Sequence, residues 1–414
     1  MKQIALLGFG TVGLGVYEII NQHRGLYFAG KDTPAAIKWI LVRDKNKKRP
    51  VNPTDCVLTD DFNDILNDPS VNIVISAMGG MEPEYTYIKK SLEKGKHVVT
   101  ANKEVICGHI SELTTLANKN GVKLYYEAAV GGGIPIISSI VETLKINKIT
   151  KIQGILNGTT NFILTKMTKE MMDFDEVLKI AQQLGFAEAD PTADVEGYDV
   201  MRKICILASL AFHTHAKTED VHLRGISNIT LDDVKMADSM GYAFKYIGQA
   251  LLKEDRYSIS VTPVLLPKDS VMCNVNQEYN VILLYGDIIG ELCFMGKGAG
   301  KDATANAVVS DTIKALNEED AGNHINFDET ASSYGLSGIR NQYYIRADVS
   351  NYGQFEKVID LMAGMIKKNN LTYTNSKVFF TTESIRSKDM LSLYEQLKEV
   401  SDDVFYARME HSLL

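Results

Sequence analysis

The chain has 414 residues, 45% of them hydrophobic and 23% charged, which predicts two or three globular domains that need neither disulfides nor metals to build their cores. The 44 Lys and Arg against 52 Asp and Glu give a net charge of −8, and this mild acidity argues against a nucleic-acid binder, which needs a basic face. No apolar run is long enough to span a membrane and the N-terminus enters a strand pattern at once, so we expect a cytoplasmic protein whose five scattered cysteines are buried and reduced.

The first 135 residues alternate strand and helix patterns. Strands are predicted at 4–7, 37–42, 73–76, 97–100 and 123–126, and helices at 12–22, 85–93 and 113–118. Strands that alternate with helices imply βαβ units and a parallel sheet.

A glycine-rich segment, Gly8-Phe9-Gly10-Thr11-Val12-Gly13, directly follows the first strand and opens the first helix. In a dinucleotide-binding turn, the first glycine allows the sharp bend, the second lets the backbone approach a pyrophosphate, and the third lets helix and strand pack closely. The N-terminus of the helix also offers donors to the phosphates. We therefore expect residues 1–135 to form a Rossmann-type domain that binds NAD or NADP.

The second strand ends at Arg43-Asp44, and the basic residues Lys45, Lys47, Lys48 and Arg49 follow. An acidic residue at this position holds the ribose 2′-hydroxyl of NAD, whereas a nearby arginine accepts the 2′-phosphate of NADP. Both types are present, so the choice of coenzyme stays open, with the basic residues favouring NADP. For the lysines, a solvated charged turn is the alternative interpretation.

Lys103 follows another strand, in the segment Thr100-Ala101-Asn102-Lys103. The carboxyl ends of parallel strands line the ligand crevice of an open α/β sheet. This position makes Lys103 a candidate to stand where cofactor and substrate meet, with an ordinary surface lysine as the alternative.

The segment from Glu127 to Pro135 contains three successive glycines, 131 to 133, which can expose backbone carbonyls. A carboxylate beside such carbonyls could bind a hard cation through oxygen ligands. A hinge between domains fits the same residues, because the pattern of elements changes here.

Residues 136–300 have an α+β pattern, with strands predicted at 149–156, 258–263, 282–285 and 291–295, and a helix at 175–184. The polar residues 157–160 suggest a turn, and the helix at 204–212 is apolar all round and therefore predicted to be buried. Asp199 and Lys203 precede this helix with i,i+4 spacing, so they share a helix face. A surface ion pair is the plain interpretation, but the continuation into a buried helix favours a covered pocket, where a lysine held by a carboxylate can give and take protons.

Residues 301–340 begin with a long helix through residue 316, and we expect this segment to pack back on the first domain. Residues 341–414 suggest a separate small α+β domain. Its strands are predicted at 343–348, 377–382 and 404–409, and its helices at 354–367 and 388–398.

Taken together, these motifs resemble the homoserine dehydrogenase family. The matching segments occur in that family's order across about the first 340 residues: Gly8 to Gly13, Val98 to Lys103, Glu127 to Pro135, Leu156-Asn157-Gly158-Thr159-Thr160-Asn161, and Asp190-Pro191 through Asp194 to Lys203. The joint match is far more specific than the dinucleotide motif alone.

The resemblance implies NAD(P)-dependent interconversion of L-aspartate 4-semialdehyde and L-homoserine, on the route to threonine, methionine and isoleucine. It implies that Lys203 donates the proton to the aldehyde oxygen and that Lys103 is a second candidate in proton transfer. Glu188 and Asp199 would hold the amino group and hydroxyl of the substrate, with Asp194 and Thr160 beside them.

The resemblance also implies further ligand contacts. Gly185, Glu188 and Gly300 would approach the nicotinamide half of the cofactor, together with Lys103. A sodium ion would lie at the Glu127 side, against the backbone carbonyls of Val130, Gly132 and Ile134. The middle region, 136–300, would bind substrate and form a homodimer or homotetramer.

Two departures from the family pattern stand out. The stretch Ser76-Ala77-Met78 lacks an acidic residue that the family often carries there. Residues 341–414 resemble an ACT-like domain, as in members that respond to threonine, yet residues 349–353 lack the usual Pro-Gly turn. A threonine effector therefore stays open, and subunit contact is the preferred interpretation.

Two other functions compete with this one. A non-catalytic nucleotide sensor could join a Rossmann domain to an ACT-like module, but it would not need the Asp199–Lys203 pair. A different amino-acid dehydrogenase could use the same scaffold, but the turn at 157–161 and the loop from Glu188 to Lys203 favour homoserine.

Overall fold

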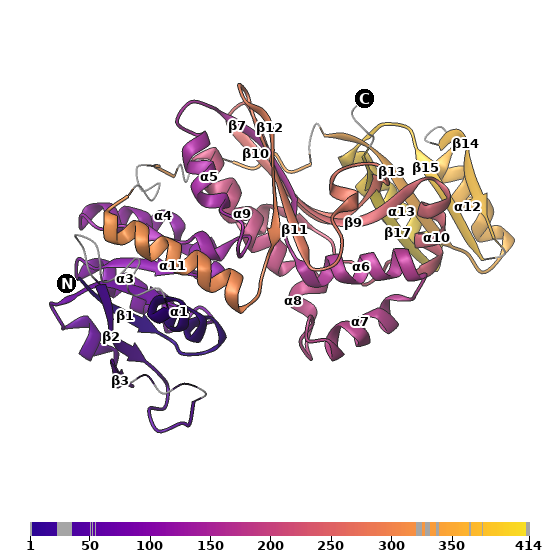
Figure 1. The fold of residues 1–414 in the computed structure, drawn as a ribbon. Helices are drawn as coiled ribbons and strands as arrows, with labels where there is room; N and C mark the ends of the chain where they lie inside the picture. The colour runs from indigo at the N-terminus through magenta and orange to yellow at the C-terminus, as the bar shows by residue number, and fades with distance from the viewer. Residues whose placement is uncertain are drawn as a thin grey trace. The chain divides into compact units, whose positions relative to one another are not determined.

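The computed structural model describes residues 2–22, 35–49, 51, 53, 55–319, 325–327, 332–336, 339–363, 366–374 and 376–410. The chain forms two compact units (Figure 1). Unit 1 comprises Met1–Ile152, Arg202–Thr218 and Ile282–Ala331, and unit 2 comprises Gln153–Met201, Glu219–Val281 and Ser332–Leu414. The division into domains at 1–135, 136–300 and 341–414 stays a prediction.

The first sheet of unit 1 has six strands in the order β3-β2-β1-β4-β5-β6, all paired in parallel. The strands are β1 (Lys2–Leu7), β2 (Ala35–Leu41), β3 (Val57–Thr59), β4 (Val71–Ser76), β5 (His97–Thr100) and β6 (Leu124–Tyr125). The order reverses at β1 and β4, so the ligand crevice of this fold lies beyond their carboxyl ends. The expected Rossmann-type sheet is confirmed.

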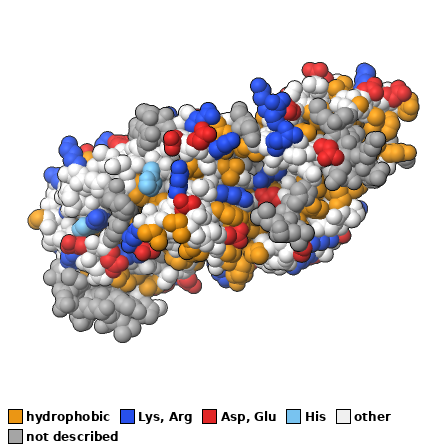
Figure 2. Space-filling view, turned by 90° about the horizontal axis from the view of Figure 1, so that it is seen from above, with side chains coloured by type: hydrophobic (Ala, Val, Ile, Leu, Met, Phe, Trp, Pro, Cys, Tyr) orange, Lys and Arg blue, Asp and Glu red, His pale blue; other side chains and the backbone are white. Residues whose placement is uncertain are grey.

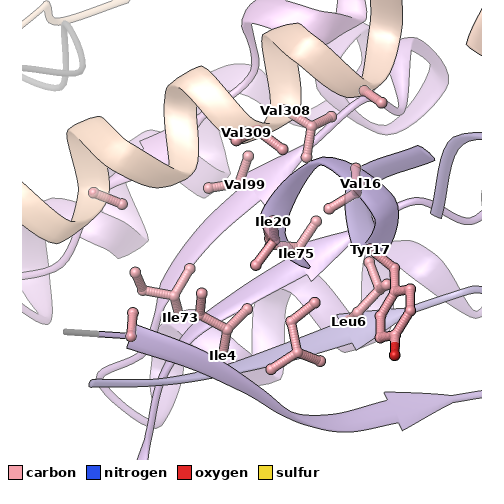
Figure 3. Packing of buried hydrophobic residues seen from close by; sticks show 14 of the residues in the cluster. Ile4, Leu6, Val16, Tyr17, Ile20, Ile73, Ile75, Val99, Val308 and Val309 are labelled. Carbon is pink, nitrogen blue, oxygen red and sulfur yellow. The ribbon is translucent and has the colours of Figure 1, made fainter. Parts of the chain in front are cut away.

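The helices of this part of unit 1 are α1 (Thr11–Gln22), α2 (Phe62–Leu66), α3 (Glu84–Glu93), α4 (Lys103–Lys119), the short η2 (Glu127–Ala129), α5 (Ile136–Thr143) and α11 (Lys301–Asn317). Although α11 is distant in sequence, it completes the core of the first sheet. Its Val308 and Val309 pack in one buried cluster with Val16 and Ile20 of α1 and Val99 of β5 (Figure 3). Burying one such side chain stabilises a fold by about 1.5–3 kcal/mol. The buried side chains of α11 therefore contribute substantially to the stability of this core.

Unit 2 holds most of a second, mixed sheet of eleven strands. Within unit 2 the order is β9 (Tyr242–Lys253), β10 (Arg256–Pro267), β17 (Asp403–Met409), β13 (Arg340–Asp348), β15 (Lys377–Thr382) and β14 (Ile366–Tyr373), with β8 (Val221–Leu223) on β10 and β16 (Ile385–Arg386) on β13. The other strands of this sheet are β7 (Ile149–Ile155), β11 (Tyr279–Gly286) and β12 (Gly290–Lys297). Because β10 pairs in parallel with β17, the C-terminal strands continue the sheet of the middle region.

The helices of unit 2 are α6 (Gly158–Glu170), α7 (Phe174–Gln183), α8 (Thr192–Val195), η3 (Thr218–Asp220), α10 (Leu231–Ser239), η4 (Met272–Asn274), α12 (Tyr352–Met362) and α13 (Ser387–Val400), and α9 (Tyr198–Phe212) begins there. The apolar stretch of α9 from Ile204 to Ala211 is buried, which confirms the expectation from its pattern. The short α8 interrupts the segment that the sequence suggests is a continuous loop before α9.

Two helices begin in segments where the sequence does not predict a helix. α4 begins at Lys103, ten residues before the predicted helix, because the Oδ1 of Asn102 accepts hydrogen bonds from the amides of Glu104 and Val105. α6 begins in the expected turn at 157–160, because the Oδ1 of Asn157 accepts a 2.8 Å bond from the amide of Thr160. An asparagine in this role satisfies amides that have no partner within the helix.

One prediction for the C-terminal region was wrong. The helix expected through residue 367 ends at Met362, and an additional strand, β14, begins at Ile366. β14 ends the strand order and is therefore an edge strand. Its Lys and Asn residues at 367–370 have low strand propensity, and such polar residues are common on edges because they discourage pairing with other chains.

The surface agrees only in part with the composition-based expectations. Figure 2 shows acidic and basic side chains interspersed over the face in view. Among the described residues, no helix is long and apolar enough to cross a membrane. None of the five cysteines, all among the described residues, forms a disulfide, but Cys293 on the edge strand β12 is exposed, which corrects the expectation that the thiols are buried.

A buried ion pair ties the C-terminal strands to α10. Arg346 of β13 and Asp233 of α10 are 1% and 0% exposed, and Arg346 Nε lies 3.1 Å from both carboxylate oxygens. The Tyr344 hydroxyl donates a further 2.7 Å bond to Asp233, whose carboxylate also accepts bonds from the amide and hydroxyl of Thr230. Every lone-pair direction of this carboxylate therefore has a donor.

We expect Asp233→Asn to reduce the free energy of unfolding by about 1–3 kcal/mol, because it removes the fully buried counter-charge of Arg346 and leaves only the more exposed Asp348 and Asp403 paired with the guanidinium. The matched control is Asp232→Asn at the next residue, whose partner Lys377 forms an exposed pair and which should cost less than about 1 kcal/mol. Chemical denaturation of both variants makes the comparison. Equal losses would mean that the buried pair does not hold the C-terminal strands.

Candidate functional site

The glycine turn of unit 1 has the geometry that its sequence predicts. Gly8 has φ +93°, which favours glycine. A Cβ on Gly13 would lie 2.2 Å from the carbonyl oxygen of Gly8, whereas a Cβ on Gly10 would meet no atom within 4 Å. The first and third glycines are thus required by the fold, and the second leaves open space in front of the backbone.

A pocket of about 560 Å³ lies beside this turn. Its lining includes Gly8, Phe9 and Gly10 after β1, Arg43 and Asp44 after β2, and Gly79 after β4. Lys47, Lys48 and Arg49 complete a basic rim, and Arg43, Lys47 and Lys48 are exposed. Thr11 and Val12 form the first turn of α1. The pocket lies beyond the carboxyl ends of the strands, where a dinucleotide would bind.

Two acidic residues at the rim of the pocket already have hydrogen-bond or ion-pair partners. Asp60 forms a 3.0 Å ion pair with Lys45, and an Asp44 carboxylate oxygen accepts a bond from the amide of Asn46. Arg49 donates to the carbonyls of Asp44 and Lys47, which fixes this turn. Arg43, directly after β2, is one of three exposed cations that line the pocket, with Lys47 and Lys48.

A buried carboxylate that the sequence reasoning missed organises the strand ends. Glu84 of α3 is fully buried and accepts bonds from Ser76 Oγ at 2.7 Å, Asn102 Nδ2 at 2.6 Å and Thr100 Oγ1 at 3.3 Å. Burial raises the pKa of Glu84, and the bonds from Ser76 and Asn102 oppose the shift. The Ser76 stretch lacks the acidic residue expected from the family, and here α3 supplies a carboxylate to the Ser76 hydroxyl.

Glu84 also fixes the start of α4, where Lys103 is the first residue. The amide nitrogen of Asn102 binds Glu84 and the carbonyl of Gly80, while its oxygen caps α4. One signal could have revealed Glu84: it is the first-turn residue of a helix that directly follows the glycines 79–80. The partners themselves come from two separate segments, at residue 76 and at residues 100–102, and their pairing with Glu84 is not visible in the sequence.

Unit 1 brings together the helices that carry the two candidate lysines. Arg202 of α9 forms a 3.1 Å ion pair with Glu104 of α4. These residues are the immediate neighbours of Lys203 and Lys103. Lys203 is 8% exposed, which fits the expectation of a covered lysine rather than a surface one.

In unit 2, one asparagine side chain joins two of the predicted substrate residues. Asn157 Nδ2 donates to Asp194 at 2.7 Å and to Asp199 at 2.9 Å, while its Oδ1 caps α6. Asp199 is buried and stands on α9 one turn before Lys203. Asn157 was quoted only as part of a motif in the sequence, and its bridging role follows from the fold.

The other predicted residues are placed differently. Thr160 is 1% exposed, and its hydroxyl donates to the carbonyl of Asn157 within its own helix. Glu188 is exposed, and its carbonyl accepts a bond from Gln182. Gly185, after α7, and Gly300, before α11, have φ of +77° and +112°.

The carboxylate of Glu127 is buried and caps α5. It accepts bonds from the amides of Ile137 at 2.6 Å and Ser138 at 2.9 Å, and lies 3.6 Å from Lys314 Nζ. Asp311 accepts the amide of Glu127 and a bond from Lys314, and burial raises the pKa of Asp311 to about 6. Residue spacing does not reveal this buried cluster, because Asp311 and Lys314 lie on α11, which is distant from Glu127 along the chain.

The glycine turn after Glu127 leaves two carbonyls available. Val130 and Gly132 are buried, and among the described residues their carbonyl oxygens accept no hydrogen bond, whereas that of Ile134 accepts the amide of Ile136. A Cβ on Gly132 would lie 2.6 Å from the carbonyl carbon of Gly298, so only glycine fits. The part of the chain that the structure describes holds no cluster of three His, Cys, Asp or Glu side chains, so a cation here would depend on backbone oxygens.

Comparison with known proteins places these residues in a family. A family model described as the NAD binding domain of homoserine dehydrogenase matches residues 8–127, and a second, described as homoserine dehydrogenase, matches residues 135–313. The homoserine dehydrogenase of Bacillus subtilis is 46% identical over 314 residues, covering 76% of this chain and 72% of that protein.

Solved structures agree with this match. A homoserine dehydrogenase from Thiobacillus denitrificans has a TM-score of 0.89 at 32% identity, covering 99% of this chain and 98% of its own. A hyperthermophilic archaeal homoserine dehydrogenase in complex with NADPH has a TM-score of 0.65 at 26% identity, covering 77% of this chain and 98% of its own.

The two glycines of the turn make a matched pair for a test. We expect Gly13→Ala to reduce the free energy of unfolding by about 1–3 kcal/mol, because its Cβ collides with the backbone. Gly10→Ala should leave stability unchanged but weaken NADPH binding about tenfold, or 1.4 kcal/mol, since its Cβ enters the open space. Thermal unfolding and fluorescence titration separate the effects. Unchanged NADPH affinity in folded Gly10→Ala would rule out this turn as the pyrophosphate site.

Proposed function

The chain belongs to the homoserine dehydrogenase family, and on that premise we propose which of its residues perform the reaction. The activity is the NAD(P)-dependent interconversion of L-homoserine and L-aspartate 4-semialdehyde, a step of amino-acid biosynthesis. The observation that carries the assignment of residues is the pairing of Asp194 and Asp199 by Asn157, one helical turn before Lys203.

Lys203 is the proton donor. Bound NAD(P)H would supply a hydride to the aldehyde carbon, and NAD(P)+ would accept one from homoserine in the reverse direction, so that an alkoxide charge develops on the aldehyde oxygen. An ammonium at that oxygen stabilises the charge and then protonates it. The burial of Lys203 supports this role, because an electrostatic interaction is stronger where water is excluded. Lys103, whose helix is joined to α9 through the Glu104–Arg202 pair, is the second candidate.

The carboxylates bind the polar ends of the substrate. L-Homoserine carries an ammonium group, and two carboxylates held by one amide provide the opposite charge. We assign Asp199 to the hydroxyl and amino side of the substrate with Asp194 behind it. Glu188 and Thr160 are assigned from the family pattern. Glu188 is exposed, so a substrate that arrives from solvent can reach it.

NADP is the proposed coenzyme. The basic rim of the 560 Å³ pocket supports it, with Arg43 placed to accept a 2′-phosphate. The archaeal relative crystallised with NADPH points the same way. The open space in front of Gly10 fits a pyrophosphate, while Gly185 and Gly300 follow the family pattern at the nicotinamide end.

A sodium ion at the turn after Glu127 is a further proposal. The unbonded carbonyls of Val130 and Gly132 support it, since hard cations prefer oxygen ligands. The Glu127 carboxylate already accepts several donors, so its part is to fix the turn and add negative charge. Such an ion would hold the backbone in place and take no part in proton transfer.

A homodimer or homotetramer is proposed from the edge strand β12. The exposed apolar side chains Ile146, Ile288, Ile289 and Met295 lie on or beside the β11–β12 hairpin, and an unpaired edge with apolar residues is suited to joining a second chain. The free cysteines support a cytoplasmic location. The C-terminal strands are proposed to aid subunit contact, and threonine as an effector stays a prediction of the resemblance.

We expect Lys203→Met to lower kcat by about 100- to 10,000-fold, the range that general acid catalysis usually contributes, without changing the dissociation constant for NADPH. Lys103→Met tests the second candidate, and exposed Lys119→Met on the same helix α4 is the control. Initial rates with homoserine and NADP provide the measurement. A kcat within threefold of the parent for Lys203→Met would exclude this lysine as the proton donor.

We expect Arg43→Gln to raise the KM for NADPH about tenfold, or 1.4 kcal/mol, with kcat and the KM for NADH unchanged, since only NADPH carries the 2′-phosphate. Lys45→Gln is the control because Lys45 pairs with Asp60 and does not line the pocket. Steady-state kinetics with both coenzymes decides. Equal effects on NADPH and NADH would contradict recognition of the phosphate by Arg43.

A further inference from the structure

Unit 2 contains a second cavity, formed entirely by its own residues. One wall comes from β8, β9 and β10, with Gln249 and Ser260 among its side chains, and the other comes from β13, α13 and β17, with Arg408. Asn157, Asp194 and Asp199 do not line it. The cavity is therefore separate from the proposed substrate residues.

Two buried polar atoms of the lining have no hydrogen-bond partner among the residues that the structure describes. Gln249 is 7% exposed, and its Oε1 accepts no hydrogen bond; the Nη2 of Arg408 is also buried and donates none. The other end of Arg408 is fixed, because its Nη1 forms a 2.9 Å ion pair with Glu410. A buried polar group without a partner is unfavourable, so a ligand that accepts from Arg408 Nη2 and donates a hydroxyl to Gln249 Oε1 would be stabilised by both contacts.

The charge of the lining has one sign. It includes the guanidinium groups of Arg224 and Arg408 and no Asp or Glu side chain. Arg224 is held over the ring of Tyr406, 3.6 Å from its centre, and donates to the Tyr406 carbonyl. Burial and the neighbouring Arg224 lower the pKa of His222 to about 4, so its imidazole is neutral at pH 7. The cavity thus attracts an anion and offers no carboxylate to an ammonium group.

The size of the cavity limits the ligand. It has about 40 Å³ of room for the centres of water-sized spheres. Because one water needs roughly 10–15 Å³ of such room, the space suits about three to four water-sized groups. A nucleotide is excluded, whereas a small carboxylate or a phosphate fits.

We propose that this cavity is a binding site for a small anion that also carries a hydroxyl group, a hydroxycarboxylate of a few non-hydrogen atoms or inorganic phosphate, with its charge at Arg408 and its hydroxyl at Gln249. The anionic oxygen accepts from the unpartnered Nη2 of Arg408, the hydroxyl of the ligand donates to Gln249 Oε1, and the hydroxyl of Ser260 in the lining provides a further donor. A zwitterionic amino acid is bound more weakly, because its ammonium group meets two guanidinium groups and no acidic side chain. The bound anion would join β10 to β17 and α13 and so stabilise the attachment of the C-terminal strands.

Calorimetric titration of the full chain with L-lactate, sodium phosphate and L-threonine tests the proposal. We expect saturable binding of lactate or phosphate, and whichever binds more tightly identifies the class of anion. Arg408→Gln should weaken that binding at least tenfold, whereas Arg386→Gln, at an exposed arginine outside the cavity, should leave it unchanged. The comparison of the two variants also separates this site from the basic rim near Arg43. Neither substitution alters that rim, so binding there would be the same in both variants.

Gln249→Met, which keeps the volume of the side chain, provides a second test if Arg408→Gln does not fold, and should weaken binding several-fold. Circular dichroism confirms that each variant is folded. The proposal is overturned if neither lactate nor phosphate binds at 10 mM (about the weakest affinity that calorimetry resolves), if the folded variants bind both as tightly as the parent, or if threonine binds more tightly than either anion.

Discussion

The site depends on the side chain of Asn157, which makes three hydrogen bonds in two directions. Its oxygen satisfies an amide at the start of α6, and its nitrogen holds Asp194 and Asp199 within 3 Å of the same atom. Two carboxylates so close together repel each other, and a cation near both lowers the free energy of the arrangement. On the proposed assignment an ammonium group of the substrate is such a cation, so one residue would form both the helix cap and the substrate site.

In the proposed coenzyme-binding part of unit 1, the main constraint is close packing. The turn between β1 and α1 allows no side chain at Gly13, and α11 then covers α1 and the sheet with Val308 and Val309. A rigid core beneath the turn keeps the open space at Gly10 in front of the strand ends. The Glu84 network extends the same order to the start of α4, because it joins β4, β5 and Asn102.

The sequence predicted features that depend on local chemistry. The glycine turn, the parallel sheet and the burial of α9 all follow from residue spacing, and Lys203 could be singled out because a charged pair enters an apolar helix. It could not predict partners that are distant along the chain: Glu84 with Ser76 and Asn102, Asp311 with Glu127, or Arg346 with Asp233. It also missed β14, since an edge strand of Lys and Asn lacks the alternation that marks a buried strand.

The central claim is that Lys203 transfers the proton while the neighbouring carboxylates hold the substrate. A crystal structure of the full chain with NADP and L-homoserine tests it most directly. The account predicts Lys203 Nζ within about 2.6–3.2 Å of the homoserine hydroxyl, the reach of a proton donor, with a carboxylate oxygen of Asp199 also in contact with the substrate. The account would be contradicted if the homoserine hydroxyl were hydrogen-bonded to Lys103 instead. In that result Lys203 Nζ would lie more than about 4 Å from the hydroxyl, with no room for a proton to pass from one to the other.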